Sequence, residues 1–306
     1  NGIVVGTGIT LSKDGDIFAT GVTTATTFVG NVTSGKTGIG FTDSNIKVGN
    51  TALDSLTTGT HNTAVGHNAL TANTTGNRNT AVGRHALTSN TTSLDNTGVG
   101  YHALEQNTTG AENTAVGSYS LDANTTASDN TAVGYVALTS NTTGGNNTAI
   151  GQQSLQSSTT TSNNTALGKD ALRYFTASNN TAIGVDAMQG ASGSSTGGNN
   201  VAIGMNALLS DTTGTNNVAV GANAADANTT GGYNIAVGQN SLGANTTGNY
   251  NIAIGQDALA NNNADNNTAV GRSALVSNTT GADLTAVGAN ALDANTTGIR
   301  NIAVGS

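Results

Sequence analysis

The feature that most constrains this chain is a repeat of about 17 residues, with the signature Asn-(Thr/Ile/Val)-Ala-(Val/Ile/Leu)-Gly. Of the fifteen intervals between signature glycines, twelve are 17 residues long, two are 16 and one is 20. Such a unit has no room for two helices and a turn, and Asn, Thr and Gly are poor helix residues. Strict repetition of a short unit predicts a solenoid, in which each coil buries its apolar side chains against its neighbours. The signature glycines are Gly49, Gly66, Gly83, Gly100, Gly117, Gly134, Gly151, Gly168, Gly184, Gly204, Gly221, Gly238, Gly255, Gly271, Gly288 and Gly305.

The three residues before each glycine predict a short strand. The first is β-branched and the third is aliphatic in all sixteen copies, and the middle one is Ala in fourteen, with Lys47 and Gly98 as the departures. Alternation along a strand places the β-branched and aliphatic side chains on one face and Ala on the other. Because both faces are apolar or small, we expect one to face the coil interior and the other a neighbouring chain.

The rest of the coil contains Leu four residues after the glycine and usually ends in Asn-Thr-Thr-Gly. We expect a tight turn at the glycine, a second short strand and then a polar loop. Stacking of coils about 4.8 Å apart would cover the Leu and Val side chains and give a rod about 70 Å long. Asn lies four residues before the glycine in fifteen of sixteen copies, with Leu284 as the exception, which predicts an Asn ladder along the rod.

Residues 45–306 are therefore predicted to form an all-β parallel β-solenoid, or β-roll, of about fifteen 17-residue coils. Residues 1–44 lack the repeat and are predicted to be a β-rich cap or the end of a shaft, two alternatives that the sequence leaves open. Strands are expected at Ile3–Val5 and at Ile17–Ala19, the second of them after a turn at Asp14–Asp16. Phe18, Phe28 and Phe41 are candidates to plug the end of the solenoid.

Composition excludes several classes of protein. Only 3% of residues are aromatic and 8% are charged, against about 25% charged in typical domains, so a thin core of small aliphatic side chains is expected. The net charge of −8 comes from scattered acidic residues, which disfavours a nucleic-acid partner. No stretch reaches the roughly 18 apolar residues of a membrane span, so no membrane insertion of this segment is expected. The chain begins without Met and stops within a repeat, as expected for a segment of a longer polypeptide.

The repeats also resemble those of known fibrous proteins. Asn62–Gly66 and Asn234–Gly238 resemble the head repeats of YadA-like trimeric autotransporter adhesins, although the adhesin unit is nearer fourteen residues. The fuller unit Asn-Thr-Ala-Val-Gly-x-x-Ala-Leu-x-x-Asn-Thr-Thr-Gly, together with Gly15–Gly30, resembles repeats in tail-fibre and structural proteins of marine bacteriophages, especially cyanophages. The resemblance implies a left-handed, homotrimeric β-roll.

For function, the resemblance implies a structural fibre segment of a phage tail or virion, serving host attachment. The expected partners are the chain itself, other fibre or virion proteins, and a host-surface glycan or protein receptor. The expected location is the virion or the extracellular surface. The alternatives are a cell-surface trimeric adhesin, a polysaccharide-degrading spike and an ice-binding solenoid. The ice-binding alternative is disfavoured because the paired Thr residues fall in turns rather than in a Thr-x-Thr strand.

Three pairs of residues in adjacent coils were weighed as sites. His85 and His102 could hold a metal, but no carboxylates share their column of the repeat. Asp170 with Asp186, and Glu105 with Asp122, are stacked acidic pairs that we interpret as solvated surface charge. No residue is therefore assigned a catalytic, cofactor-binding or metal-binding role, and the chain is not expected to be an enzyme.

Two further features were given structural interpretations. Nine Asn-Thr-Thr sites match the N-glycosylation sequon but are interpreted as turn residues of the repeat. The 20-residue coil contains a Gly- and Ser-rich stretch, Gly190–Gly198. It is interpreted as a tolerated insertion, with a receptor-contacting tip as the alternative.

Overall fold

The computed structural model describes residues 9–11, 17–19, 39–42, 44–191 and 195–306. The chain divides into two units, residues 1–34 and 35–306. In the first unit, strand β1 (Ile9–Leu11) pairs antiparallel with β2 (Ile17–Ala19), which confirms the predicted strand at the latter position. The predicted strand at Ile3–Val5, the turn at residues 14–16 and the proposed plug of Phe side chains lie outside the residues whose structure and side chains are described.

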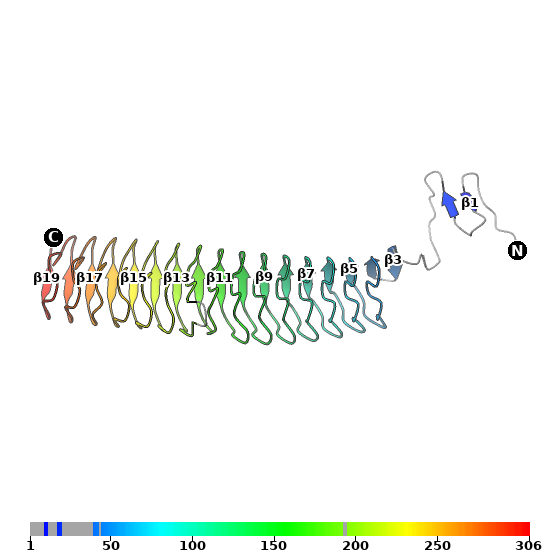
Figure 1. Ribbon diagram of the computed structural model, residues 1–306, viewed down its shortest axis with the longest axis horizontal. Helices are drawn as coiled ribbons and strands as arrows, with labels where there is room; N and C mark the ends of the chain where they lie inside the picture. The colour runs from blue at the N-terminus through cyan, green and yellow to red at the C-terminus, as the bar shows by residue number, and fades with distance from the viewer. Residues whose placement is uncertain (1–8, 12–16, 20–38, 43, 192–194) are drawn as a thin grey trace. The chain divides into compact units, whose positions relative to one another are not determined.

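The second unit is a parallel β-solenoid of about fifteen turns with roughly 17 residues per turn, and its described residues include no helix (Figure 1). Each strand pairs in parallel with the next one along the chain, and equivalent residues face each other, as Thr63 faces Thr80. The predicted fold class is thereby confirmed. The strands of this unit are β3 (Ile39–Thr42), β4 (Asn45–Val48), β5 (Thr63–Val65), β6 (Thr80–Val82), β7 (Thr97–Val99), β8 (Thr114–Val116), β9 (Thr131–Val133), β10 (Thr148–Ile150), β11 (Thr165–Leu167), β12 (Thr181–Ile183), β13 (Val201–Ile203), β14 (Val218–Val220), β15 (Ile235–Val237), β16 (Ile252–Ile254), β17 (Thr268–Val270), β18 (Thr285–Val287) and β19 (Ile302–Val304).

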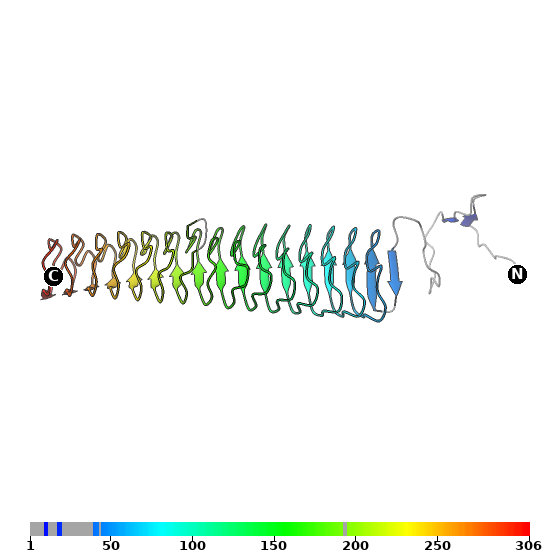
Figure 2. The ribbon, with the colours of Figure 1, turned by 60° about the horizontal axis from the view of Figure 1, so that its bottom comes forward.

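Strand β3 differs from the others because it runs antiparallel to its neighbour (Figure 2). Ile39 in β3 faces Val48 in β4, and the parallel ladder begins only at β4. An unpaired edge strand is a template for pairing with other chains. The β3–β4 hairpin therefore covers the first edge of the parallel sheet with main chain.

Each regular coil contains one strand, so the expected second strand is wrong. In the coil after β5, Asn68 and Leu70 have φ angles of 59° and 52°, and the equivalent positions of the other coils are also left-handed. Left-handed residues at alternate positions are incompatible with an extended strand. The main chain still bonds to the next coil, since the amide of Leu70 donates to the Ala86 oxygen at 3.1 Å.

The core is a thin layer of Ala and Leu side chains. Ala64 from the strand and Ala69 and Leu70 from the turn are fully buried, and the same columns are buried along the rod. The strand's β-branched and aliphatic side chains point outward instead, as the 38% exposure of Ile150 shows. The expectation that stacking covers Leu is confirmed, whereas the expectation that it covers the residue before the glycine is wrong.

The predicted Asn ladder is confirmed inside the solenoid. The main-chain amide and the Nδ2 of Asn62 both donate to Asn45 Oδ1, at 2.8 and 3.1 Å, and the Asn62 Nδ2 also donates to the Gly76 oxygen at 2.8 Å. These bonds join three segments of two successive coils. They satisfy amide groups that would otherwise be buried without partners.

A second buried Asn ladder lies seven residues after the signature glycine, where a polar loop was expected. Asn90 Nδ2 donates to Asn73 Oδ1 at 3.1 Å, and Asn107 Nδ2 donates to Asn90 Oδ1 at the same distance. These are the Asn residues of the Asn-Thr-Thr sites, and eight of the nine are buried. Their hydrogen bonds support the structural interpretation of the sequons. The ladder is interrupted by Phe175, which is fully buried.

Candidate functional site

The most chemically distinctive cluster of the described solenoid lies between β6 and β9. His85 and His102 each lie two residues after a signature glycine, in consecutive coils, and their ring centroids are 4.9 Å apart. Both residues have left-handed φ angles, 61° and 57°, so the turn holds their side chains in register. The predicted proximity of the two imidazoles is confirmed.

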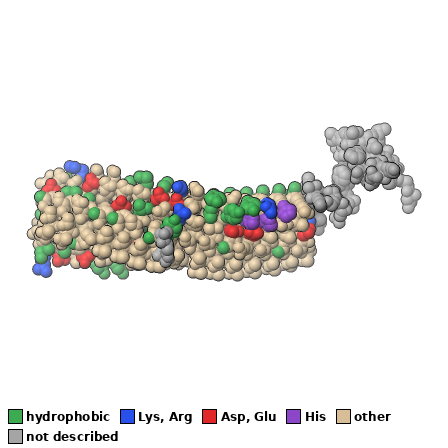
Figure 3. Space-filling model, viewed as in Figure 1, with side chains coloured by type: hydrophobic (Ala, Val, Ile, Leu, Met, Phe, Trp, Pro, Cys, Tyr) green, Lys and Arg blue, Asp and Glu red, His purple; other side chains and the backbone are tan. Residues whose placement is uncertain are grey.

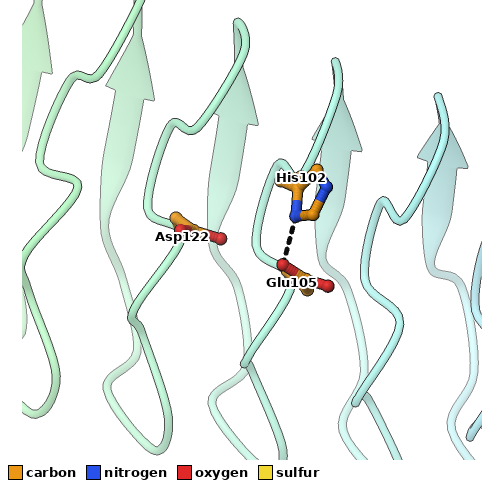
Figure 4. A group of neighbouring side chains, drawn as sticks. All are labelled: His102, Glu105 and Asp122. Atoms are coloured by element: carbon orange, nitrogen blue, oxygen red, sulfur yellow. Dashed lines mark hydrogen bonds and ion pairs between the residues drawn. The ribbon is translucent and has the colours of Figure 1, made fainter.

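Two carboxylates lie beside these imidazoles, from the column five residues after the glycine. Glu105 Oε2 hydrogen-bonds His102 Nδ1, and its Oε1 lies 3.6 Å from His85 Nδ1 (Figure 4). One ligand atom each of His102, Glu105 and Asp122 lies within 4.8 Å of the other two. On the surface of the solenoid, His side chains lie next to a row of acidic ones (Figure 3).

The sequence argument against a metal site was therefore incomplete. It looked for carboxylates only in the column of the two histidines. Left-handed residues at the second and fourth positions after the glycine fold the turn tightly, which brings the second and fifth columns together. The signal available in the sequence was the three-residue spacing of His102 and Glu105 within one such turn.

The cluster is half-buried, and part of its polar capacity is unused. His85 Nδ1 and Asp122 Oδ1 are buried and have no hydrogen-bond partner among the described residues. Burial lowers the pKa of His85, an effect that Glu105 partly opposes and His102 reinforces. Burial also raises the pKa of Asp122, with the negative charge of Glu105 adding to the shift. The neutral imidazole is the form that binds metal ions.

Aromatic side chains fix the imidazole of His102. The ring of Tyr101 lies 4.0 Å from it between centroids, and the ring of Tyr119, in the next coil, stacks on it at 5.3 Å. The guanidinium of Arg84 lies 5.7 Å from the centre of the Tyr101 ring. These contacts restrict the ring that faces Glu105.

The pair Asp170 and Asp186 has a different environment. Asp170 is buried and forms ion pairs with Lys169 at 3.3 Å and with Arg173 at 3.2 Å. The interpretation of Asp170 as solvated surface charge is therefore wrong, because Arg173 comes from the adjoining fifth column and covers it. Asp186 is partly exposed and accepts a hydrogen bond from Gln189 at 3.2 Å. The balanced charges of Asp170 fit a structural ion pair.

The 20-residue coil keeps its place in the stack on both sides of residues 192–194, which lie outside the described residues. The amide of Thr176 donates to the Ser195 oxygen at 2.8 Å, and Phe175 forms a parallel bridge with Ser195. These contacts are compatible with a tolerated insertion.

Comparison with known proteins adds no relative: no protein-family model matches the chain, and no curated protein matches it. In the part of the chain that the structure describes, no helix is long and apolar enough to cross a membrane.

Proposed function

We propose that this chain is a stiff segment of a phage tail or virion fibre, and that three copies associate side by side through the outer face of the parallel sheet to display host-attachment elements. The observation that carries the proposal is the outer face itself. Along each strand it presents a β-branched residue and then an aliphatic one, at positions that repeat from coil to coil in register.

The outer face is apolar enough to favour a covering partner. Val116, Ile150 and Leu167 are 37%, 38% and 44% exposed although they lie in the middle of a regular sheet. Extended apolar surface of this kind typically marks an interaction site. The register of the strands makes the face uniform along the solenoid, so an identical face on a second and third copy would match it in spacing.

The interior of the solenoid supports a mechanical role. Coils are joined by main-chain bonds, by two Asn ladders and by a continuous Ala–Leu core. Each coil contacts chiefly its neighbours, so stiffness is distributed along the solenoid rather than concentrated at one place. The left-handed, homotrimeric form and the virion or extracellular location belong to this proposal through the resemblance of the repeats.

Light scattering with electron microscopy of the purified chain tests the proposal. A mass of three times 30.0 kDa with thin rods is the expected result. A 30.0 kDa particle at micromolar concentration would overturn the trimer. Binding of labelled rods to host cells, compared with non-host cells, then separates a host-attachment fibre from a purely mechanical one. A trimeric cell-surface adhesin shares the rod and differs in requiring a membrane anchor elsewhere in its gene.

One observation favours ice binding as a second candidate. Eight consecutive strands place a Thr at their first position on the outer face, with an aliphatic residue two positions later; these Thr residues are Thr63, Thr80, Thr97, Thr114, Thr131, Thr148, Thr165 and Thr181. The paired Thr residues do fall in turns, as predicted, but this separate Thr row on the strands was not considered. Thermal hysteresis of a monomeric sample would support ice binding, and its absence would remove this candidate.

A further inference from the structure

We propose that His85, His102, Glu105 and Asp122 form a binding site for a Zn²⁺-like transition-metal dication that joins three consecutive coils of the solenoid. The site is independent of the proposed fibre function, because all four residues belong to one chain. His85 lies in the coil after β6, His102 and Glu105 in the coil after β7, and Asp122 in the coil after β8.

The donor set selects the class of metal. Two imidazole nitrogens with two carboxylates match the N and O ligands that Zn²⁺ takes in tetrahedral sites. Ca²⁺ and Mg²⁺ prefer all-oxygen shells, so the imidazoles argue against them. First-row transition metals such as Co²⁺ and Ni²⁺ share the affinity for imidazole, which makes Co²⁺ a useful spectroscopic substitute.

The geometry brings the donors close without any change of main chain. Glu105 contacts both imidazoles, through Oε2 to His102 and through Oε1, at 3.6 Å, to His85. Asp122 completes a group whose ligand atoms lie within 4.8 Å of one another. Ligand distances of about 2.0–2.2 Å require donors to lie roughly 3–3.5 Å apart, a contraction that side-chain rotations can supply.

Two atoms in the cluster are without partners in a way that a cation would correct. His85 Nδ1 and Asp122 Oδ1 are buried and have no partner among the described residues, and an orphaned buried polar atom is costly. Glu105 and Asp122 also lie in adjacent coils, so their negative charges repel each other. A dication between them would remove the repulsion and use both free lone pairs.

Metal bound there would stabilise the stack locally. Its ligands come from three successive coils near the N-terminal end of the solenoid, so separating any of these coils would break metal–ligand bonds. Binding to the folded chain raises its stability as the ratio of free metal to dissociation constant rises. The site is thus a clamp on coil stacking rather than a catalytic centre.

Titration of the chelator-treated full chain with ZnCl₂ by calorimetry, with a parallel thermal melt, tests the clamp. We expect one Zn²⁺ per chain and a higher melting temperature with Zn²⁺ but not with equal MgCl₂. Co²⁺ should give visible absorption bands of the intensity typical of tetrahedral sites. His102→Ala and Glu105→Gln should each weaken Zn²⁺ binding at least tenfold. The matched control is His61→Ala, which removes an exposed His outside the cluster.

The proposal is overturned if the chain takes up no Zn²⁺ at millimolar concentration, or if His61→Ala weakens binding as much as His102→Ala. Asp122→Asn is the second test of the cluster, because it preserves size and can be used if the other variants fold poorly. It too should weaken binding, and unchanged affinity in all three cluster variants would exclude the site. Light scattering on the same samples keeps this result separate from the fibre proposal, since stoichiometry per chain does not depend on trimer formation.

Discussion

The side-chain amide of Asn228 donates to Asp211 Oδ1 at 2.9 Å, while Asp211 Oδ2 is buried without a hydrogen-bond partner among the described residues. Asp211 occupies the position that Asn fills in most coils of the second ladder. Burial raises the pKa of its carboxyl group to about 7, although hydrogen bonds from Asn228 and from the Gly214 backbone oppose the shift. One coil of the solenoid therefore carries a titratable group inside a ladder of neutral amides.

Stability should fall as pH rises from about 4 to about 7. Below that window the Asp211 carboxyl is protonated in both folded and unfolded chains. Within it, the unfolded chain loses its proton first, so deprotonation favours unfolding. The shift from 3.8 to about 7 corresponds to on the order of 4 kcal/mol at about 1.4 kcal/mol per pKa unit. Denaturant titrations at pH 4 and pH 8 measure the difference.

Asp211→Asn should remove this contribution by restoring the ladder. At pH 8 the variant should be more stable than the parent by a few kcal/mol, and at pH 4 the two should be nearly equal. Asp129→Asn, at an exposed position, is the matched control and should leave the pH dependence unchanged. Equal stability of parent and Asp211→Asn at pH 8 would show that the carboxyl is not the source of the effect.

Gly134→Ala should be among the most damaging single substitutions in the rod. The φ angle of Gly134 is 139°, and a Cβ there would lie 2.5 Å from the Gly151 oxygen in the next coil. Side chains rarely adopt this φ, and the neighbour is main chain that cannot rotate away. We expect a loss of several kcal/mol in chemical unfolding.

The control for that substitution is Gly145→Ala. Equivalent positions in the adjacent coils carry Ser128 and Ser162, so the column accepts a Cβ. We expect a change within about 0.5 kcal/mol, as for ordinary surface positions. Comparable losses at Gly134 and Gly145 would mean that close approach of the stacked glycines is not what requires glycine.

The fold was predictable because periodicity carries its information in every coil. The spacing of Gly66 and Gly83 gave the coil length, and the alternation of Thr63, Ala64 and Val65 gave the strand. The conformation of the turn was not predictable, because Leu70 at a φ of 52° contradicts the usual preference of bulky residues. Hydrogen bonds to both neighbouring coils and burial of the Leu side chain outweigh that local preference.

The second Asn ladder and the His–carboxylate cluster were missed for a related reason. Asn73 in Asn-Thr-Thr-Gly is a typical turn residue, and nothing local distinguishes a turn at the surface from one whose Asn points inward. Glu105 is close to His85 only because the turn folds one column against another. Contacts between different columns depend on the shape of the turn, which the repeat pattern does not specify.

Asn113→Ala tests the contribution of a single rung of the first ladder. Asn113 Oδ1 accepts from the main-chain amide of Asn130 at 3.1 Å, so the substitution leaves that buried donor without an acceptor. We expect a loss of about 1–3 kcal/mol in the free energy of unfolding. Glu112→Ala changes the preceding, exposed residue and should have little effect in the same denaturant titration. A neutral Asn113→Ala would show that water replaces the lost acceptor.

Charges placed on the outer face of the sheet should separate the copies of the chain. In the double variant Val116→Lys/Ile150→Lys, six ammonium groups would meet in a trimer, and burying unpaired charge is far more costly than losing two apolar contacts. We expect the mass by light scattering to fall toward 30.0 kDa. Thr109→Lys/Thr143→Lys adds the same charge at the same two-coil spacing on exposed loop positions, and should leave the mass unchanged. Dissociation by the loop variant but not by the sheet variant would place the contact between copies on the loop side, whereas a trimer that survives both would exclude the outer face as its interface.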